Sequence, residues 1–165
     1  MNDAWLRDVI TKSTVLLFRD YGIELTPTAA PCPEHPVELC GGVGFSGKNA
    51  RGTLLCASSK EPLRRLSEGK CASERDWLAE ISNQLLGRIK SRLLRRGVEI
   101  MLSPPIVLRG EHLAPLPRAK LVPLSFEMDG GSVFVWLDVE LDPAVDLASE
   151  EEHDVGLVEG QSLIF

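Results

Sequence analysis

Hydrophobic residues at helical spacing predict a helix near the start of the chain, over about residues 3–20. Asn2 or Asp3 can cap its first turn, and Gly22 follows as a stop signal. The apolar residues that recur three and four positions apart are Trp5, Leu6, Val9, Ile10, Leu16 and Leu17. This periodicity is typical of a helix that packs one face against a core.

The strongest helix signal lies in the middle of the chain. Ser73 and Asp76 form the S-x-x-D version of a capping box. The helix that they start spans about residues 74–96, and Gly97 stops it. A shorter helix is expected over residues 61–68.

Runs of β-forming residues predict five strands, at about residues 37–45, 51–57, 98–108, 119–128 and 132–140. The glycines of residues 44–49 and of Asp129-Gly130-Gly131 indicate two hairpin turns. Four prolines in residues 26–36 indicate a loop. We therefore expect an α+β domain over residues 1–142, built from two related helix-then-strands halves, with long helices packed on an antiparallel or mixed sheet. Residues 143–165 are interpreted as an acidic tail that docks on the body or is partly disordered.

Composition narrows the class of protein. The chain has 165 residues, 44% of them hydrophobic, which is enough for one domain without metal or disulfide staples. No apolar run reaches the roughly 18 residues of a membrane span, and the start carries no secretory signal, so we expect a cytoplasmic protein with no membrane partner. The net charge of -6 argues against nucleic-acid binding. No CxxC pair joins the cysteines, which predicts reduced thiols and no metal site (Cys32, Cys40, Cys56 and Cys71).

The long central helix has two different faces. Its apolar face, which is expected to pack on the sheet, contains Leu78, Ile81, Leu85, Ile89 and Leu93. Its other face contains Glu80, Asn83, Gly87 and Lys90, and the i, i+3 pair of Glu and Asn points the same way. A mid-helix glycine costs about 1 kcal/mol relative to alanine, so it favours either close helix packing or room for a partner's backbone. On these residues alone the face is either a solvated helix surface or a polar site.

The sequence around this face resembles a known family. Residues 80–90 (EISNQLLGRIK) resemble the E-x-x-N-x-x-x-G-x-x-K helix of the chemotaxis phosphatases CheX and CheC. Residues 44–47 (GFSG) with 51–55 (RGTLL) resemble the hairpin of the CheC/CheX/FliY family, and residues 102–110 (LSPPIVLRG) resemble its S-x-P segment. The order and spacing agree over about residues 1–140, and CheX-type proteins are the most similar members.

The resemblance implies a hydrolase that removes phosphate from the phosphoaspartate of a CheY-like response regulator, in chemotaxis or a related two-component circuit. It assigns Asn83 to orienting the attacking water and Glu80 to pairing with a receiver lysine. Gln84, Gly87 and Lys90 are the expected partner-binding residues. The Mg²⁺ ion of the reaction is held by the receiver, so the chain is expected to need no cofactor of its own.

The resemblance also limits the number of sites. CheC-type members carry a second E-x-x-N in the other half, but residues 3–20 contain none, so one site per chain is expected. CheX-type proteins pair through their sheets, which implies a homodimer. The alternatives are a non-catalytic module of the same fold that binds a receiver or a flagellar-switch component, and an unrelated structural α+β protein.

Overall fold

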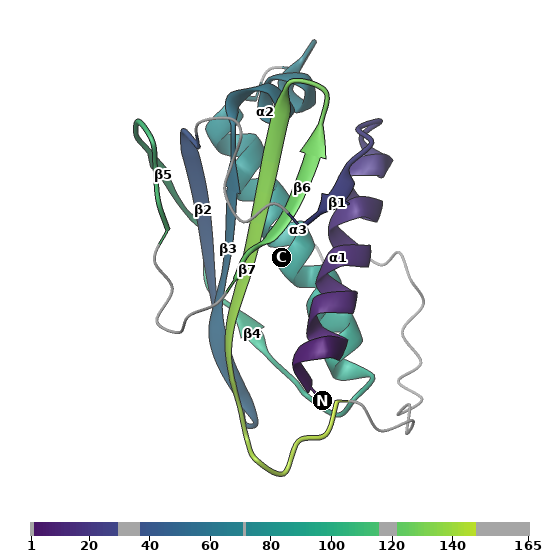
Figure 1. Cartoon of the computed structure of the whole chain (residues 1–165). Helices are drawn as coiled ribbons and strands as arrows, with labels where there is room; N and C mark the ends of the chain where they lie inside the picture. The colour runs from purple at the N-terminus through teal and green to yellow at the C-terminus, as the bar shows by residue number, and fades with distance from the viewer. Residues whose placement is uncertain (1, 30–36, 71, 116–121, 148–165) are drawn as a thin grey trace.

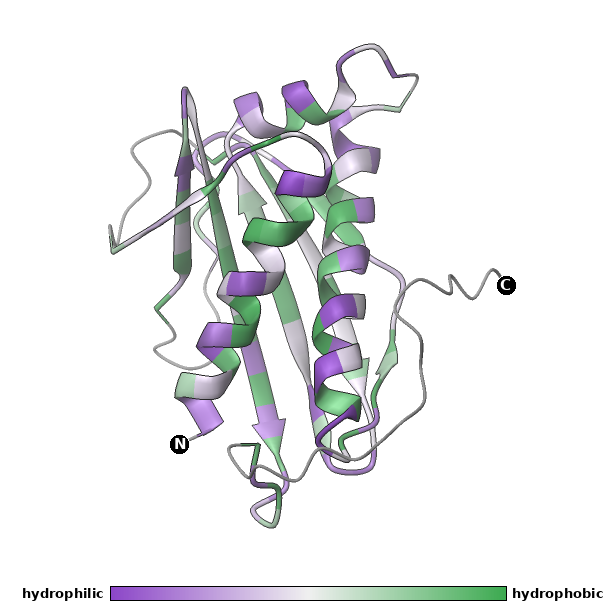
Figure 2. Ribbon diagram, turned by 90° about the vertical axis from the view of Figure 1, so that its right-hand side faces the viewer, coloured by the Kyte–Doolittle hydropathy of each residue, from purple (hydrophilic) through white to green (hydrophobic). Residues whose placement is uncertain are grey.

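A computed structural model describes residues 2–29, 37–70, 72–115 and 122–147. Three helices pack on a seven-stranded sheet, and the two long helices, α1 and α3, lie side by side on one of its faces (Figures 1 and 2). The helices are α1 (Asn2–Asp20), α2 (Lys60–Ser67) and α3 (Glu74–Leu94). The strands are β1 (Thr26–Thr28), β2 (Leu39–Ser46), β3 (Ala50–Ser58), β4 (Met101–Leu102), β5 (Ile106–Arg109), β6 (Leu124–Met128) and β7 (Gly131–Leu141).

The sheet combines the two halves of the chain. The order is β1-β6-β7-β3-β2-β4, β5 also pairs with β2, and every pairing is antiparallel. The hairpins β2–β3 and β6–β7 meet at the centre, where β3 pairs with β7. The strand after each long helix crosses to the other half: β1 pairs with β6, and β4 pairs with β2. The predicted α+β fold of two helix-then-strands halves is confirmed in this arrangement.

Both long helices end as the sequence predicts. The N-terminal capping box of α3 is present in both directions, because Ser73 Oγ accepts a hydrogen bond from the Asp76 N–H and the Asp76 carboxylate accepts one from the Ser73 N–H. At their C-termini, Gly22 and Gly97 have φ angles of +76° and +73°, a region that glycine enters without steric cost. Val98 N–H then donates to the carbonyl of Leu93, which satisfies a terminal acceptor of α3.

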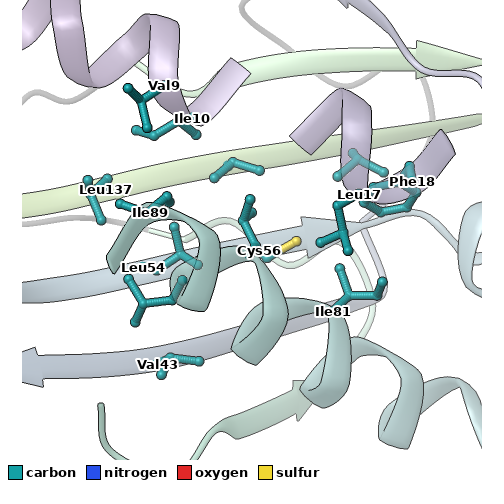
Figure 3. Close-up of a cluster of buried hydrophobic side chains, with 14 of the residues drawn as sticks. Val9, Ile10, Leu17, Phe18, Val43, Leu54, Cys56, Ile81, Ile89 and Leu137 are labelled. Carbon is teal, nitrogen blue, oxygen red and sulfur yellow. The ribbon is translucent and has the colours of Figure 1, made fainter. Parts of the chain in front are cut away.

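The main core lies between the long helices and the sheet (Figure 3). Side chains from α1, α3, β2, β3 and β7 meet there, among them Leu17, Phe18, Val43, Leu54, Cys56, Ile81 and Ile89, which are all at most 1% exposed. A smaller apolar cluster, which includes Phe134 and Trp136 of β7, lies outside this core. The main core attaches α3 to the sheet, whereas the smaller cluster is formed by Val37 and by residues of β2, β3 and β7.

Proline explains two differences from the sequence prediction. The predicted loop at residues 26–36 begins with a strand, β1, although it contains Pro27. An edge strand tolerates proline because its N–H groups are needed on one side only, and in the described sheet β1 pairs with β6 alone. The predicted strand at 98–108 is divided into β4 and β5, because Pro104 and Pro105 have no N–H to donate to a ladder.

Two further predictions concern the cysteines and the membrane. Cys40 and Cys56 are free and buried, and burial raises their thiol pKa values to about 11 and about 12. Cys32 and Cys71 lie outside the described residues, as do residues 119–121 of a predicted strand. Within the described ranges, no helix is long and apolar enough to cross a membrane.

Candidate functional site

A close contact with β2 fixes the position of α3 on the sheet. A Cβ added to Gly41 would lie only 2.5 Å from Ser82 Oγ, so glycine allows the helix to approach the strand closely. Ser82 is fully buried, and its hydroxyl donates to the Leu78 carbonyl at 2.7 Å. Small residues on both elements therefore bring the helix against the sheet one residue before Asn83.

The two faces of α3 differ as the helical wheel predicts. The apolar residues are fully buried against the sheet (Leu78, Ile81, Leu85, Leu86, Ile89 and Leu93). Glu80 is exposed on the outer face, and Asn83 is partly exposed one turn later. Among the described residues, none hydrogen-bonds to the Asn83 side chain. Its amide thus offers a donor and an acceptor to a bound molecule.

A hydrogen-bonded chain holds the carboxylate of Glu80. Gln84 Nε2 donates to Glu80 Oε1 at 2.6 Å, and the hydroxyl of Tyr21 lies within 3.1 Å of both amide atoms of Gln84. Tyr21 in turn packs edge-on against Trp77, with ring centroids 5.4 Å apart. The Lys70 ammonium lies 4.3 Å from the centre of the Trp77 ring. These contacts orient Glu80 on the surface of α3.

The contact of Tyr21 with Gln84 was not predicted from the sequence. Tyr21 follows the end of α1 and is separated from Gln84 by 63 positions, so no local pattern connects the two. An ion pair at 2.6 Å between Asp20 and Arg88 joins the same helices one turn further along α3. The last turn of α1 therefore braces the outer face of α3.

The structure decides between the two explanations of Gly87. A Cβ added there would have no described atom within 4 Å, so close packing inside the described chain does not account for the glycine. Lys90, one turn later, is partly exposed and has no ion-pair partner among the described residues. The outer face of α3 therefore has no side chain at Gly87. The carboxylate of Glu80 and the amide of Asn83 precede this position, and the ammonium of Lys90 follows it.

The polar groups of this face do not form a metal site. In the parts of the chain that the structure describes, no group of three or more His, Cys, Asp or Glu side chains could hold a metal ion. The outer face of α3 thus offers the oriented carboxylate of Glu80 and the amide of Asn83, which has no hydrogen bond among the described residues. Such groups can pair with a cation and position a small polar molecule.

This arrangement of helices and sheet is the fold of the CheX and CheC-like chemotaxis proteins. The structure of CheX from Vibrio vulnificus matches 81% of this chain and 95% of its own, with 18% identity and a TM-score of 0.69. A CheC-like superfamily protein from Shewanella sp. PV-4 matches 82% of this chain and 97% of its own, with 17% identity and a TM-score of 0.70. The family resemblance of the sequence is thereby confirmed at the level of the fold.

A third structure contains a partner. CheX from Borrelia burgdorferi, solved as a complex with CheY, BeF3 and Mg²⁺, matches 81% of this chain and 96% of its own, with 16% identity and a TM-score of 0.65. No protein-family model and no curated protein sequence matches the chain.

Proposed function

We propose that this protein dephosphorylates the phosphoaspartate of a CheY-like receiver domain. The observation that carries the proposal is the amide of Asn83, to which no described residue hydrogen-bonds and which lies on the accessible face of α3 one turn from the oriented carboxylate of Glu80. The complex of CheX with CheY supports the choice of partner, because it shows that a protein of this fold binds a receiver. The reaction takes place in the cytoplasm, where we expect the receiver.

The chemistry needs little from the phosphatase beyond positioning. The oxygen of a water molecule bonds to phosphorus as the bond from phosphorus to the aspartate oxygen breaks, which leaves inorganic phosphate and a free carboxylate. Phosphoryl transfer of this kind depends on alignment and electrostatics rather than on covalent participation. The Asn83 amide can align the water because it both donates and accepts hydrogen bonds and does not titrate.

Glu80 has an anchoring role in this proposal. Its carboxylate pairs with a receiver lysine, which requires only that it stays ionised. The hydrogen bond from Gln84, itself held by Tyr21, reduces the number of positions that the carboxylate samples before the partner arrives. Mg²⁺ would be held by the receiver.

Gly87 and Lys90 complete the contact surface. The open space above Gly87 lets the backbone of a receiver loop lie directly on the helix, and Lys90 supplies a cation for the acidic surroundings of a phosphorylated aspartate. Gln84 contributes its exposed part to the same surface. These residues bind the partner and do not take part in the chemical step.

The homodimer expected from the family is a separate proposal. The strand β5 pairs only with β2, so its other edge is open within the described sheet. Its Ile106 and Leu108 are 68% and 59% exposed, and an apolar edge of this kind favours pairing with a second copy. Analytical ultracentrifugation of the wild type and of Ile106→Lys should give a dimer and a monomer, respectively. A monomeric wild type would contradict the proposal.

The phosphatase proposal is tested by measuring phosphate release. Purified CheY-like receiver domains are phosphorylated with acetyl phosphate, and release is followed with the wild type, Asn83→Ala and Arg19→Ala, a control on the exposed surface of α1. The wild type and the control should accelerate release, and Asn83→Ala should lose about 100-fold of that acceleration because the water is no longer aligned.

Circular dichroism establishes that Asn83→Ala is folded. If the wild type binds the phosphorylated receiver without accelerating release, the protein is a binding module and the proposal is wrong. If Asn83→Ala is as fast as the wild type, the phosphatase is real but the residue is misassigned.

A further inference from the structure

A basic groove lies beside the candidate site, between α1 and the C-terminal end of α3. It encloses about 200 Å³, and α1 contributes Trp5, Lys12 and Leu16 to its walls. The end of α3 contributes Arg92, Arg95 and Arg96. The two helices that form it are seen side by side in Figure 2. The groove lies on the α1 side of α3, further along the helix than Glu80 and Asn83.

The charges of the groove are not balanced by the described residues. Its one carboxylate, Asp8, pairs with Lys12 at 2.7 Å. None of the three arginine side chains has an ion pair or hydrogen bond among the described residues. Three cations side by side repel one another, so the groove favours an anionic occupant.

Arg96 gives a second and independent indication. Its guanidinium lies over the Trp5 ring, with the central carbon 5.8 Å from the ring centroid, and its Nη1 is buried without a hydrogen-bond partner. Buried polar groups are nearly always satisfied in folded proteins. The positive charge of Arg96 is thus partly buried at the wall of the groove with no carboxylate among the described residues to neutralise it, which adds to the preference of the groove for an anion.

The described part of the chain ends close to this groove. Leu147, the last described residue, is fully buried, and its N–H donates to Asn2 Oδ1 at 2.9 Å. Asn2 Nδ2 donates to the carbonyl of Val145 at 3.0 Å. Asn2 and Trp5 are one helical turn apart, so the contact of Leu147 with Asn2 lies about 5 Å along the helix axis from the end of the groove.

The remaining 18 residues of the sequence form an acidic segment, and its charge is therefore opposite to that of the groove. They contain five acidic residues and no lysine or arginine, and the first acidic residue stands three positions after Leu147. The groove runs along α1 from Trp5 to Leu16, about 16 Å of helix. An extended chain covers about 3.3 Å per residue, so residues 148–154 are long enough to follow it. Val155 and Leu157 come next and can cover Leu16, which is 36% exposed.

We propose that residues 150–154 (Glu-Glu-Glu-His-Asp) dock in this groove and pair with Arg92, Arg95 and Arg96. The groove is then an intramolecular docking site for the acidic C-terminal segment. This contact places the segment on the flank of α3, next to the face that carries Glu80 and Asn83. The docking does not depend on phosphatase activity.

The test uses the full-length chain and ¹⁵N relaxation. The order parameters of residues 150–154 are measured in the wild type, in Arg92→Glu/Arg95→Glu, and in Arg19→Glu/Lys48→Glu, which has the same change of charge outside the groove. Docked residues should give values near 0.85 in the wild type and the control, and values below about 0.6 in the groove variant. Arg96 is left unchanged because it packs on Trp5.

A charge swap makes the test specific. Adding Glu150→Arg/Glu151→Arg to the groove variant should restore the high order parameters. Should charge reversal unfold the chain, Arg92→Gln/Arg95→Gln should still lower the values. Order parameters below 0.6 in the wild type, or an equal loss in the control variant, would overturn the proposal. So would a failed charge swap in a folded variant, because the groove would then serve an acidic partner from outside the chain.

Discussion

The two long helices occupy similar places in the fold, but the polar groups on their outer faces differ in how many of them have a hydrogen-bond or ion-pair partner. Both lie on the same face of the sheet, and each is followed by a glycine at positive φ. On α1 two exposed carboxylates are paired: Asp8 with Lys12 at 2.7 Å, and Asp20 with Arg88 of α3 at 2.6 Å. On α3 the Asn83 amide has no hydrogen bond among the described residues, and Gly87 borders open space. The outer face of α3 thus presents an amide that another molecule could satisfy, next to open space at Gly87.

The outer face of α3, which carries Asn83 and Gly87, is kept in position by contacts that the rest of the helix makes. Asn83 and Gly87 both lower helix propensity relative to alanine. The capping box, the fully buried apolar face and the close approach of Ser82 to Gly41 offset this loss. The main role of α1 is therefore to support α3. The inner face of α3 is buried against the sheet, and its outer face carries polar groups that a partner can contact.

The largest difference between the helices is expected in receiver binding, when one exposed carboxylate is removed from each helix. Glu80→Ala should weaken binding of the phosphorylated receiver about 30-fold or more, because the loss of one partner of an interface charge pair costs about 2 kcal/mol or more. Asp8→Ala on α1 should leave binding unchanged. Isothermal titration with a receiver carrying BeF3⁻ and Mg²⁺ measures both. Equal effects of the two substitutions would remove the distinction between the helices.

A substitution in β2 should disturb α3 through its inner face. Gly41→Ala should destabilise the protein by about 1–3 kcal/mol, because the new methyl group overlaps Ser82 and the core is already well packed. Gly42→Ala is the matched control, since its Cβ would make only an ordinary contact with Leu55 at 3.4 Å. Urea unfolding compares the two. A stable Gly41→Ala variant would show that this contact does not fix the helix.

Gly87→Ala should move stability and activity in opposite directions. The protein should gain about 1 kcal/mol, the difference in helix propensity between alanine and glycine, because the methyl group meets no described atom. The same methyl group should hinder the approach of the receiver and raise KM. Thermal unfolding and steady-state phosphate release measure the two effects. A gain in stability with unchanged KM would mean that no partner backbone lies against Gly87.

The smallest effect concerns the start of α3 and depends on pH. Hydrogen bonds from Ser73, and then from Arg75, lower the pKa of Asp76 to about 2. Because this folded-state pKa lies below the ordinary value of about 4, the carboxylate stabilises the fold above pH 4 and loses its effect as the pH falls towards 2.

Urea unfolding from pH 7 to pH 2 checks this prediction. Asp76→Asn should be less stable than the wild type at pH 7, and the difference should close near pH 2. Asp3→Asn in the first turn of α1 serves as the control. A difference between the wild type and Asp76→Asn that stays constant with pH would exclude the capping carboxylate as its source.

Local signals made most of the helical structure predictable. The Ser73–Asp76 box and Gly97 mark the limits of α3, and the spacing of its apolar residues by three and four positions identified the buried face. The Glu80–Asn83 pair was visible because an i, i+3 spacing places two side chains on one face of a helix without any tertiary information.

The remaining features depend on contacts between distant residues. The Tyr21–Gln84 contact joins two helices, and the close approach of Gly41 to Ser82 depends on how α3 crosses the sheet. The strand β1 was missed because Pro27 indicates a loop unless the strand is known to lie at an edge. Sequence periodicity identifies which face of an element is buried, but not which element covers it.

Asn83 is proposed to act in the chemical step and not in binding. A limiting amount of phosphorylated receiver is mixed with increasing concentrations of the wild type or of Asn83→Ala, and the rate of phosphate loss is followed in a single turnover. We predict that the half-saturating concentration is the same for both, and that the variant reaches only about one hundredth of the wild-type maximal rate. A variant that saturates at the wild-type rate would contradict the account.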